Sequence, residues 1–438
     1  MGEWFEGKLA DVCASVDYGL TASASDIPVG PKFLRITDIV GSSFDWAHVP
    51  FVPATGKDTE KYKLYSGDIV IARTGATTGE SRYIIDPPNA VFASYLVRLK
   101  INDKNDPRFI GYWLKSPAFK NYLQGVLGDK SAQPNASAST MANAPIRIPA
   151  TRGEQVRISA ILGLLDDKIE ANRRMNATLE AMAQAIFRDW FVDFGPTHRK
   201  QEGATDPVQI MGGVTQNAED AARLADLFPD AFGNDGLPQV WEMGTLSDLV
   251  ELNPKEPLKK GTVAPYTDMA SLPTAGPTTA APLLRAFSSG MRFRNGDALI
   301  ARITPCLENG KSAYVDFLPD DKSVGWGSTE FIVLRSKPPV PSPFAYLIVR
   351  HPEFRERAIQ SMTGTSGRQR AQADTLANFR ISKARPEVYS GFADIIRPMF
   401  EMIRANAIQN QTLAETRDLL LPRLMSGEIS FKDAEAAA

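Results

Sequence analysis

Residues 154–194 contain the feature that most constrains the fold, an apolar seam that fits one long helix. The seam positions follow one another in steps of four and three residues, the heptad spacing that keeps side chains on one helix face. No proline interrupts this segment, and Gly163 is its one residue of low helix propensity. The seam consists of Ile158, Leu162, Leu165, Ile169, Asn172, Asn176, Leu179, Ala183 and Ile186.

The same seam recurs 234 residues later, and both copies carry two asparagines at matching positions. A buried asparagine in a seam lowers stability but specifies register and partner. We therefore expect the two helices to pair with each other; the alternative is two amphipathic helices that each pack on their own domain. Pro398 lies inside the second copy and predicts a kink or a later helix start. The second seam consists of Phe392, Ile396, Met399, Ile403, Asn406, Asn410, Leu413, Arg417 and Leu420.

The repeat extends beyond the helices into two globular segments, each with short apolar runs that predict strands. A weaker match aligns Arg35–Asp38 with Pro265–Asp268. The stronger matches pair Trp-x-x-Gly-x-Leu-x-Asp at 4–11 with 241–248, the Gly-Asp strand at 67–75 with 296–304, the strand at 92–100 with 328–337, and Thr-x-Ala-Asn at 140–143 with 375–378.

These repeats predict an α+β fold of two similar mixed α/β domains, each followed by a long helix. We expect the two helices to pair as an antiparallel coiled coil, which gives the chain pseudo-twofold symmetry. The predicted parts are a first domain at 1–150, a first helix at 151–194, an acidic linker at 195–240, a second domain at 241–386, a second helix at 387–427 and a tail at 428–438.

Composition is that of an ordinary globular chain, with 43% hydrophobic and 23% charged residues in 438. The formal net charge is −2, but residues 202–235 alone carry −6 and leave +4 for the remainder. Mildly basic domains joined by an acidic segment can bind DNA locally, although a neutral protein with an acidic linker has the same composition. Cys13 and Cys306 predict no disulfide framework, and without a transmembrane or signal segment we expect a cytoplasmic protein.

Motifs for catalysis and metal binding do not emerge from the sequence. The three histidines lack metal-ligand spacing, so we expect no metal site. Residues 309–312 read Asn-Gly-Lys-Ser like the end of a phosphate-binding loop, but Pro305 stands where that loop requires glycine. Residues 86–89 resemble the Asp-Pro-Pro-aromatic motif of amino-methyltransferases, with Asn89 in the aromatic position. We therefore expect a chain that reads a ligand and has no catalytic residues of its own.

Polar loops follow strands at matching positions in the two repeats and carry side chains suited to DNA. Arginine can donate two hydrogen bonds to guanine, glutamine and asparagine pair with adenine, and hydroxyl groups reach phosphates. The alternative is that these are solvated polar loops. The candidate DNA-binding residues are Arg35, Thr37, Arg73, Thr74, Thr77, Thr78, Lys130, Ser131 and Gln133 in the first repeat, and Tyr266, Thr267, Arg302, Thr304, Ser366, Arg368, Gln369 and Arg370 in the second.

The order of these motifs, found twice in one chain, resembles the specificity subunit of a Type I restriction-modification enzyme. Leu424–Ile429 is similar to the ending of that family, and Phe228–Asp230 is similar to its linker. The resemblance implies that each domain is a target recognition domain for one half of a bipartite, asymmetric double-stranded DNA sequence. Because the match between the candidate loops ends near Arg73 and Arg302, we expect two different half-sites.

The resemblance also implies partners and cofactors. The paired helices would set the unread gap and bind two modification (methyltransferase) subunits, with Asp167, Arg173 and Arg174 as candidate contacts. It allows two restriction (translocase and nuclease) subunits to join. S-adenosylmethionine, ATP and Mg would belong to the partner subunits, with no cofactor in this chain and no contact with a membrane.

Two rival interpretations belong to other classes of protein. One is a recognition protein fused to its own methyltransferase, which the missing cofactor loop and the altered motif at 86–89 disfavour. The other is a scaffold that binds no DNA and joins two protein-binding modules through a coiled coil.

Overall fold

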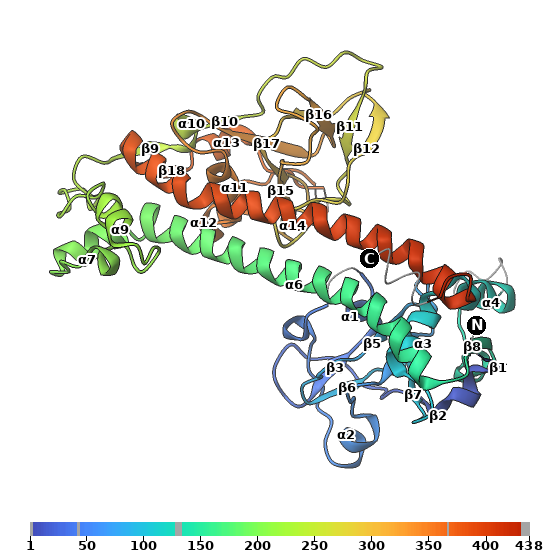
Figure 1. Ribbon diagram of the computed structural model, residues 1–438. Helices are drawn as coiled ribbons and strands as arrows, with labels where there is room; N and C mark the ends of the chain where they lie inside the picture. The colour runs from blue at the N-terminus through green and yellow to red at the C-terminus, as the bar shows by residue number, and fades with distance from the viewer. Residues whose placement is uncertain (1–2, 42–43, 128–133, 366–367, 431–438) are drawn as a thin grey trace. The chain divides into compact units, whose positions relative to one another are not determined.

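The computed structural model describes residues 3–41, 44–127, 134–365 and 368–430 (Figure 1). It divides into two compact units. Unit 1 comprises Met1–Ile169 and Gln411–Ala438, and unit 2 comprises Glu170–Asn410. The two long helices therefore each contribute to both units. None of the helices in the described ranges combines the length and apolar character needed to span a bilayer.

Unit 1 is built on an antiparallel sheet with strand order β2-β7-β4-β5, accompanied by two smaller strand pairs, β1-β8 and the parallel pair β3-β6. Short helices cover the sheet, and α3 packs against the first part of α6. The strands are β1 (Trp4–Lys8), β2 (Cys13–Tyr18), β3 (Lys32–Leu34), β4 (Ile69–Ala72), β5 (Ser81–Tyr83), β6 (Ala90–Phe92), β7 (Leu96–Ile101) and β8 (Pro145–Pro149). The helices are η1 (Leu9–Val12), α1 (Ile36–Ile39), η2 (Trp46–His48), α2 (Lys57–Tyr62), α3 (Pro107–Lys115), α4 (Pro117–Leu127), α5 (Ala138–Ala142) and α6 (Arg152–Phe191).

Unit 2 repeats this element order and adds two strands, β12 and β13, to the counterpart of the small parallel pair. Its strands are β9 (Glu242–Thr245), β10 (Val250–Leu252), β11 (Val263–Thr267), β12 (Leu283–Ala286), β13 (Met291–Phe293), β14 (Ala298–Ala301), β15 (Ser312–Tyr314), β16 (Gly325–Gly327), β17 (Phe331–Ser336) and β18 (Arg380–Lys383). Its helices are α7 (Gly195–Gln201), α8 (Pro207–Ile210), α9 (Ala218–Ala225), α10 (Leu246–Leu249), α11 (Pro343–Arg350), α12 (Pro352–Gln360), α13 (Ala373–Ala377) and α14 (Pro386–Ser426). The prediction of two similar mixed α/β domains, each followed by a long helix, is confirmed.

The repeated Trp-x-x-Gly-x-Leu-x-Asp motif has a physical basis that is the same in both units. Asp11 accepts a hydrogen bond from the Lys8 amide at 2.7 Å, and Asp248 accepts one from the Thr245 amide at 2.8 Å. Each aspartate thereby caps the short helix that follows the first strand. A Cβ atom on Gly7 would lie 2.7 Å from the Asp11 carboxylate, so a larger residue at this position of β1 would displace the capping side chain.

The two long helices pair antiparallel, as predicted. In unit 2, the Asn172 side chain donates to Gln409 Oε1 at 2.7 Å and to Asn410 Oδ1 at 2.9 Å. Asn176 donates to the Ile403 carbonyl at 3.2 Å and accepts from Asn406 at 2.8 Å. The asparagines that recur in both seams therefore hydrogen-bond to the opposite helix, which fixes one register.

The apolar seam residues lie mostly in the two cores. In unit 1, Leu162 and Leu165 of α6 share a core with Leu420 and Leu424 of α14, and Leu413 lies half-buried beside it. Ile169 of α6 is buried as well. In unit 2, Ile396 and Ile403 are buried, whereas Leu179 and Met399 are half-buried. The helix α14 begins at Pro386 and continues through Pro398, so the later start that Pro398 predicted is wrong.

Residues 195–240 are not the polar linker that their composition predicted. They form α7, α8 and α9, and their apolar side chains are part of the core of unit 2. Met211, Leu224 and Phe228 are buried, and the Phe228 ring lies 4.9 Å from that of Trp190. The composition of the segment was misleading because it averages over both faces of amphipathic helices. The acidic residues make the average polar, although one face of each helix is apolar.

Candidate nucleic-acid interface

In unit 1, the loop after β4 is tied to a second loop far away in the sequence. The Gly75 amide donates to the Pro134 carbonyl at 2.9 Å, and the Ala136 amide donates to the Arg73 carbonyl at 2.8 Å. The Arg73 side chain adds a bond from Nη2 to Asn135 Oδ1 at 3.2 Å. Two of the three predicted reading loops of the first repeat therefore form one continuous site.

The Arg73 guanidinium is held in a defined plane. Its carbon lies 4.7 Å from the centroid of the Tyr18 ring, a cation–π arrangement, and its Nε atom is buried without a hydrogen-bond partner. Tyr18 is itself fixed because its hydroxyl accepts from the Ala138 amide at 2.9 Å. An arginine held in this way loses little conformational entropy when it binds a ligand.

Unit 2 repeats this backbone geometry. The Thr304 amide donates to the Gln369 carbonyl at 3.1 Å, and the Ala371 amide donates to the Arg302 carbonyl at 2.8 Å. Isolated β-bridges join Thr74 to Asn135 in unit 1 and Ile303 to Arg370 in unit 2. The predicted loops of the second repeat thus also meet.

The side chains at this second site differ from those at the first. Arg370 forms a bidentate ion pair with Glu330, with nitrogen–oxygen distances of 2.8 to 3.0 Å. The guanidinium of Arg370 lowers the pKa of the Glu330 carboxyl below its usual value. Arg302 resembles Arg73 in one respect, because its Nε atom is also buried without a partner. The backbone is shared between the two sites, whereas the polar groups they offer are not.

The predicted hydroxyl groups have different surroundings. Thr78 donates within its loop, to the Gly75 and Pro134 carbonyls at 2.7 and 3.2 Å, so it stabilises the loop. Thr74 and Thr77 are half-buried beside it. Thr304 accepts from the Gln369 amide at 3.2 Å. These threonines therefore lie at the site, with Thr78 and Thr304 engaged in holding it together.

The remaining candidates are more scattered. Lys130, Ser131, Gln133 and Ser366 lie outside the described residues. Arg368 is exposed at the second site. Arg35 lies in another part of unit 1 and pairs with Asp38 at 2.9 Å, while Thr37 is exposed next to it.

The predicted match between Thr37 and Thr267 is wrong. Leu34 pairs with Phe92 in unit 1, and Thr267 pairs with Gly327 at the equivalent position of unit 2, so Thr267 corresponds to Leu34. Thr267 is accordingly buried, with 1% of its surface exposed, and is not available to DNA. Tyr266 is half-buried, with its ring centroid 4.4 Å from that of Trp326. The predicted match rested on the Thr-Asp pair that both segments share. The register of the paired strands, which a sequence does not show, decides the equivalence instead.

Sequence reasoning missed two residues of the sites, namely Tyr18 and Glu330. Asn135 belongs to the loop at 130–135 that the sequence indicates as a candidate reading surface. Tyr18 and Glu330 come from other strands and turns, and only the folded chain brings them to Arg73 and Arg370.

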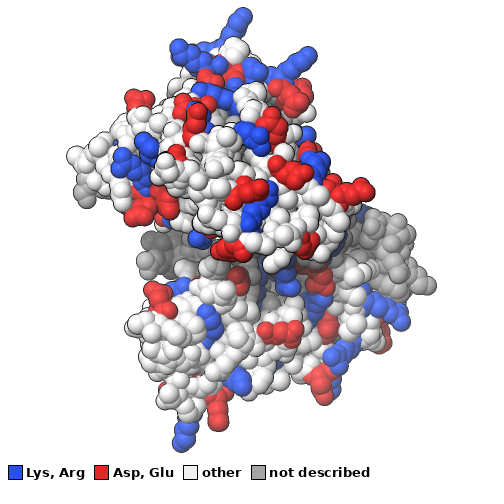
Figure 2. Space-filling model, turned by 90° about the vertical axis from the view of Figure 1, so that its left-hand side faces the viewer, with Lys and Arg blue, Asp and Glu red and all other residues white. Residues whose placement is uncertain are grey.

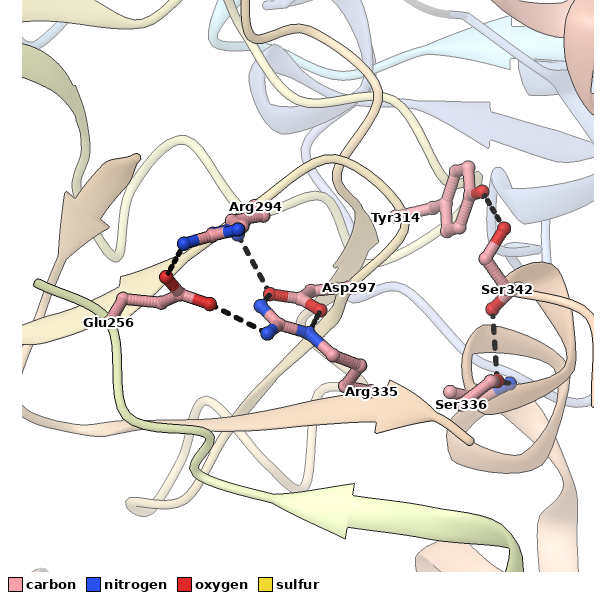
Figure 3. A network of polar contacts seen from close by, with 8 residues as sticks. Glu256, Arg294, Asp297, Tyr314, Arg335, Ser336 and Ser342 are labelled. Carbon is pink, nitrogen blue, oxygen red and sulfur yellow. Dashed lines mark hydrogen bonds and ion pairs between the residues drawn. The ribbon is translucent and has the colours of Figure 1, made fainter. Parts of the chain in front are cut away.

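An ionic network of two buried carboxylates and two half-buried arginines lies at the start of β14, the strand that leads to the second site (Figure 3). Arg335 donates to both carboxylate oxygens of Asp297 at 2.7 Å and to Glu256 at 2.6 Å. Arg294 completes it through an ion pair with Glu256 at 2.5 Å. Burial raises the pKa of Asp297 despite these partners. These four charged side chains pair with one another. They therefore stabilise the packing of β14 against β17 and do not bind a ligand.

Charged side chains of both signs are interspersed on the face of the molecule drawn in Figure 2. Within the described ranges, no group of three or more His, Cys, Asp and Glu side chains is arranged to hold a metal ion. What the two sites offer is therefore arginine, amide and hydroxyl groups on rigid loops. Such groups suit hydrogen bonding to base edges and phosphates.

Comparison with known proteins finds similarity to one family. Residues 1–181 match the family described as the Type I restriction modification DNA specificity domain. The HindI specificity subunit, from a Type I restriction enzyme of Haemophilus influenzae, is 24% identical over 98% of this chain and 100% of that protein. The MjaIX specificity subunit, from a Type I restriction enzyme of Methanocaldococcus jannaschii, is 23% identical over 84% of this chain and 76% of that protein.

A solved structure shares the fold. It is the crystal structure of a Type I restriction-modification S subunit from M. genitalium, with a TM-score of 0.53 and 13% identity over 97% of this chain and 96% of that one.

Proposed function

We propose that this chain, which carries the Type I restriction modification DNA specificity domain at residues 1–181, is the DNA-reading specificity subunit of a Type I restriction-modification enzyme. Its similarity to specificity subunits extends over nearly the whole chain. DNA target recognition is the role of such subunits. Each unit then contacts one half of a bipartite target through the site at the end of its β4 or β14 strand.

One observation carries the expectation of two different half-sites. The backbone hydrogen bonds that join the two loops are equivalent in units 1 and 2, but the groups they present are not. Arg73 is bonded to Asn135, whereas Arg370 at the position of Asn135 is bonded to Glu330. Because base edges are distinguished by their pattern of donors and acceptors, two such sites favour different bases. An asymmetric target follows.

The helices are proposed to set the unread gap and to bind the methyltransferase subunits. The helix α6 has 40 residues, which corresponds to a length of about 60 Å. Asp167 pairs with Arg108 at 2.6 Å, which leaves it less suited to a partner than expected from the sequence. Arg173 is half-buried and Arg174 is exposed, and both pair with Glu170 of the same helix. Arg174 is therefore the strongest of the three candidate contacts.

Catalysis is assigned to other chains of the complex. We propose that S-adenosylmethionine is bound by two modification subunits, and ATP and Mg by two restriction subunits where these are present. This chain then contributes only the choice of target, in the cytoplasm, where chromosomal and incoming DNA are both accessible.

The test is co-expression of the full chain with a Type I modification subunit encoded beside it, followed by mapping of methylated adenines by long-read sequencing. We expect one bipartite motif with a fixed gap. Exchange of residues 1–150 for the first domain of a relative should change one half of the motif and leave the other half and the gap unchanged. Methylation at no recurring sequence, in a complex that does assemble, would contradict the proposal and favour the scaffold interpretation.

A further inference from the structure

The sheet that unit 2 adds to the common plan has two unlike faces. Its strand order is β12-β11-β16-β13. One face packs on the core: Phe293 is fully buried, and a Cβ atom on Gly325 would lie 2.4 Å from its ring. Side chains alternate between the faces of a strand, so the neighbouring positions must lie on the other face.

That other face carries aromatic rings and arginines together. Tyr266 pairs with Trp326 and Trp326 with Arg292 across the strands, so all three point the same way. The Arg285 guanidinium lies 4.7 Å from the centroid of the Tyr266 ring, and that of Arg292 lies 5.8 Å from the Phe287 ring. We call Tyr266, Arg285, Phe287, Arg292 and Trp326 the outer face.

The cations of the outer face form no close ion pair, although Asp268, whose pKa is lowered mainly by its bonds to Ser271, also feels the charge of Arg285. Within the part of the chain that the structure describes, no carboxylate forms an ion pair with Arg285 or Arg292. Lys259 and Lys260, both exposed, immediately precede Gly261, whose amide donates to the Phe287 carbonyl at 2.8 Å. Four cations, namely Lys259, Lys260, Arg285 and Arg292, therefore lie on or beside the outer face without a close ion pair in the described ranges and can accept an anionic partner.

Unit 1 shows that the same strands can be covered by the chain itself. Phe33 and Val91 stand at the positions of Tyr266 and Trp326, and both are buried in a cluster with Val52. The connecting segments also differ in charge. Residues 19–68 carry five Lys and Arg against six Asp and Glu, whereas residues 253–297 carry six against three. Trp326 is buried like Val91, with 5% of its surface exposed, but Tyr266 is half-buried and Arg285 is exposed, so unit 2 leaves partly open, and basic, the surface that unit 1 closes.

We propose that the outer face of unit 2 binds the sugar-phosphate backbone of duplex DNA, as a second contact beside the reading site of that unit. This inference rests on the proposed DNA-reading function and adds to it a surface that the reading loops do not include. Arginines without carboxylate partners, supported by aromatic rings, offer phosphates positive charge at little entropic cost. Glu330, which holds Arg370 at the reading site, follows Trp326 by four residues, so the two surfaces belong to one module.

Contacts to phosphate predict a particular signature. Each neutralised phosphate contributes about 0.9 to the slope of log affinity against log salt concentration, and its loss weakens binding to all sequences alike. The double variant Arg285→Gln, Arg292→Gln should therefore lower the slope by about 1.8. It should weaken binding on the order of tenfold, for target and scrambled duplexes equally. The methylated motif should not change.

The experiment uses the full chain in complex with its modification subunit. Fluorescence anisotropy follows binding of a labelled duplex with the mapped motif, and of a scrambled duplex, over a series of salt concentrations. The matched control is Arg357→Gln, because Arg357 is exposed on α12 of the same unit and has no ion pair within the described ranges. It should leave the slope unchanged. Thermal melting of each variant reports whether it has folded.

Each outcome decides something. A folded double variant with the wild-type slope on both duplexes overturns the proposal for the outer face. If that variant fails to fold, Lys259→Gln with Lys260→Gln probes the same face from an exposed loop, and an unchanged slope overturns it equally. If the wild-type complex itself binds neither duplex, the DNA-reading function fails, which is a different result. Weakening of the target duplex alone would make the outer face a reader of bases and would contradict the backbone contact.

Discussion

The two units place a buried aspartate at the same point of the same turn but neutralise it differently. Gly67 and Gly296 have φ values of 96° and 91°, and the following Asp68 and Asp297 each accept a hydrogen bond from the backbone amide three residues earlier, at 3.0 and 2.8 Å. In unit 1 the nearest cation is Arg98, at 3.8 Å from Asp68. In unit 2, Asp297 is held by both arms of a guanidinium (Figure 3).

The partner arginine occupies a different position in each unit. Arg98 pairs with Val70 across the sheet, and the counterpart of that pair in unit 2 is Val333 with Leu299. Arg335 stands two residues further along the strand, on the same face. A duplicated fold therefore conserves the turn that needs a carboxylate, while the cation can come from any neighbouring position that reaches it.

The helix contacts teach the same lesson. In unit 1, the Tyr112 hydroxyl donates to Asp166 on α6 at 2.7 Å, and Arg417 on α14 donates to the same carboxylate at 2.7 Å. In unit 2, Tyr346 donates to Glu180 at 2.6 Å. Both units thus hold a globular domain to the helix pair through a tyrosine–carboxylate bond, but they use different positions on the helices.

The largest difference should follow from removing the two aspartates. Asp297→Ala removes the buried carboxylate that both arms of Arg335 hold and leaves Arg335 bonded to Glu256 alone, and about 3–5 kcal/mol of lost stability is typical when one partner of a buried ion pair is removed. Asp68→Ala loses the turn bond but only a distant ion pair, so about 1–3 kcal/mol is expected. Urea unfolding of the full chain measures both, with the exposed Asp321→Ala as control. Equal losses would contradict the comparison.

A pH-dependent difference should come from Asp316, whose counterpart in unit 1 is the exposed Ile85. Burial raises the pKa of Asp316 to about 6. A folded-state pKa above the unfolded value means that ionising this group destabilises the fold, so its cost appears as pH rises from about 4 to 6 and persists above. Asp316→Asn should therefore raise stability above pH 6, by about 1.4 kcal/mol for each unit of the pKa shift.

The same variant should have no effect below about pH 4, where the native carboxyl is protonated in both states. Thermal melting of the full chain at a series of pH values separates these regimes. A gain that is constant over the whole range would mean that the effect of asparagine is not electrostatic.

Smaller effects should distinguish the two tyrosine–carboxylate bonds. Tyr346→Phe removes a hydrogen-bond donor from Glu180, which is only 8% exposed and keeps an ion pair with Arg350 at 3.3 Å, and should cost about 1.5–3 kcal/mol. Tyr112→Phe should cost about 0.5–1.5 kcal/mol, because Arg417 still satisfies Asp166. Chemical unfolding measures both. If the Tyr112 variant proved the more damaging, Arg417 would not be the partner that compensates.

The smallest effects should be equal in the two units. Asn143 and Asn378 are both exposed, and each donates to the carbonyl four residues earlier at 2.9 Å. Replacement of either by alanine should cost about 0.5–1 kcal/mol. A clear inequality, measured by the same unfolding experiment, would show that the Lys8 bond to Asn143 contributes.

The sequence predicted the structure correctly where the type and spacing of side chains determine it. The heptad spacing predicted both long helices, and the matched asparagines predicted their partner, because an amide in an apolar seam needs an opposite polar group. The alignment of Arg73 with Arg302 agrees with the equivalent hydrogen bonds of their backbones. In these cases the residue type and its spacing are themselves the cause of the structure.

Predictions from the sequence were wrong or incomplete where the register and packing of the backbone determine which residues meet. Thr267 occupies the position of Leu34. Strand pairing sets this equivalence, and the two residue types have too little in common for a sequence alignment to find it. The apolar residues Met211 and Phe228 were lost in an acidic segment. The partners of Arg73 and Arg370 come from remote strands, and no local pattern announces them.

The sharing of the long helices has a consequence for how the chain matures on the ribosome. Unit 2 is one continuous stretch, Glu170–Asn410, and its parts are all available before synthesis ends. Unit 1 is discontinuous, and its core includes Leu420 and Leu424 beside Leu162. The earlier segment of unit 1 must therefore wait, with this apolar surface exposed, until Leu420 and Leu424 emerge, so unit 2 can be completed before unit 1.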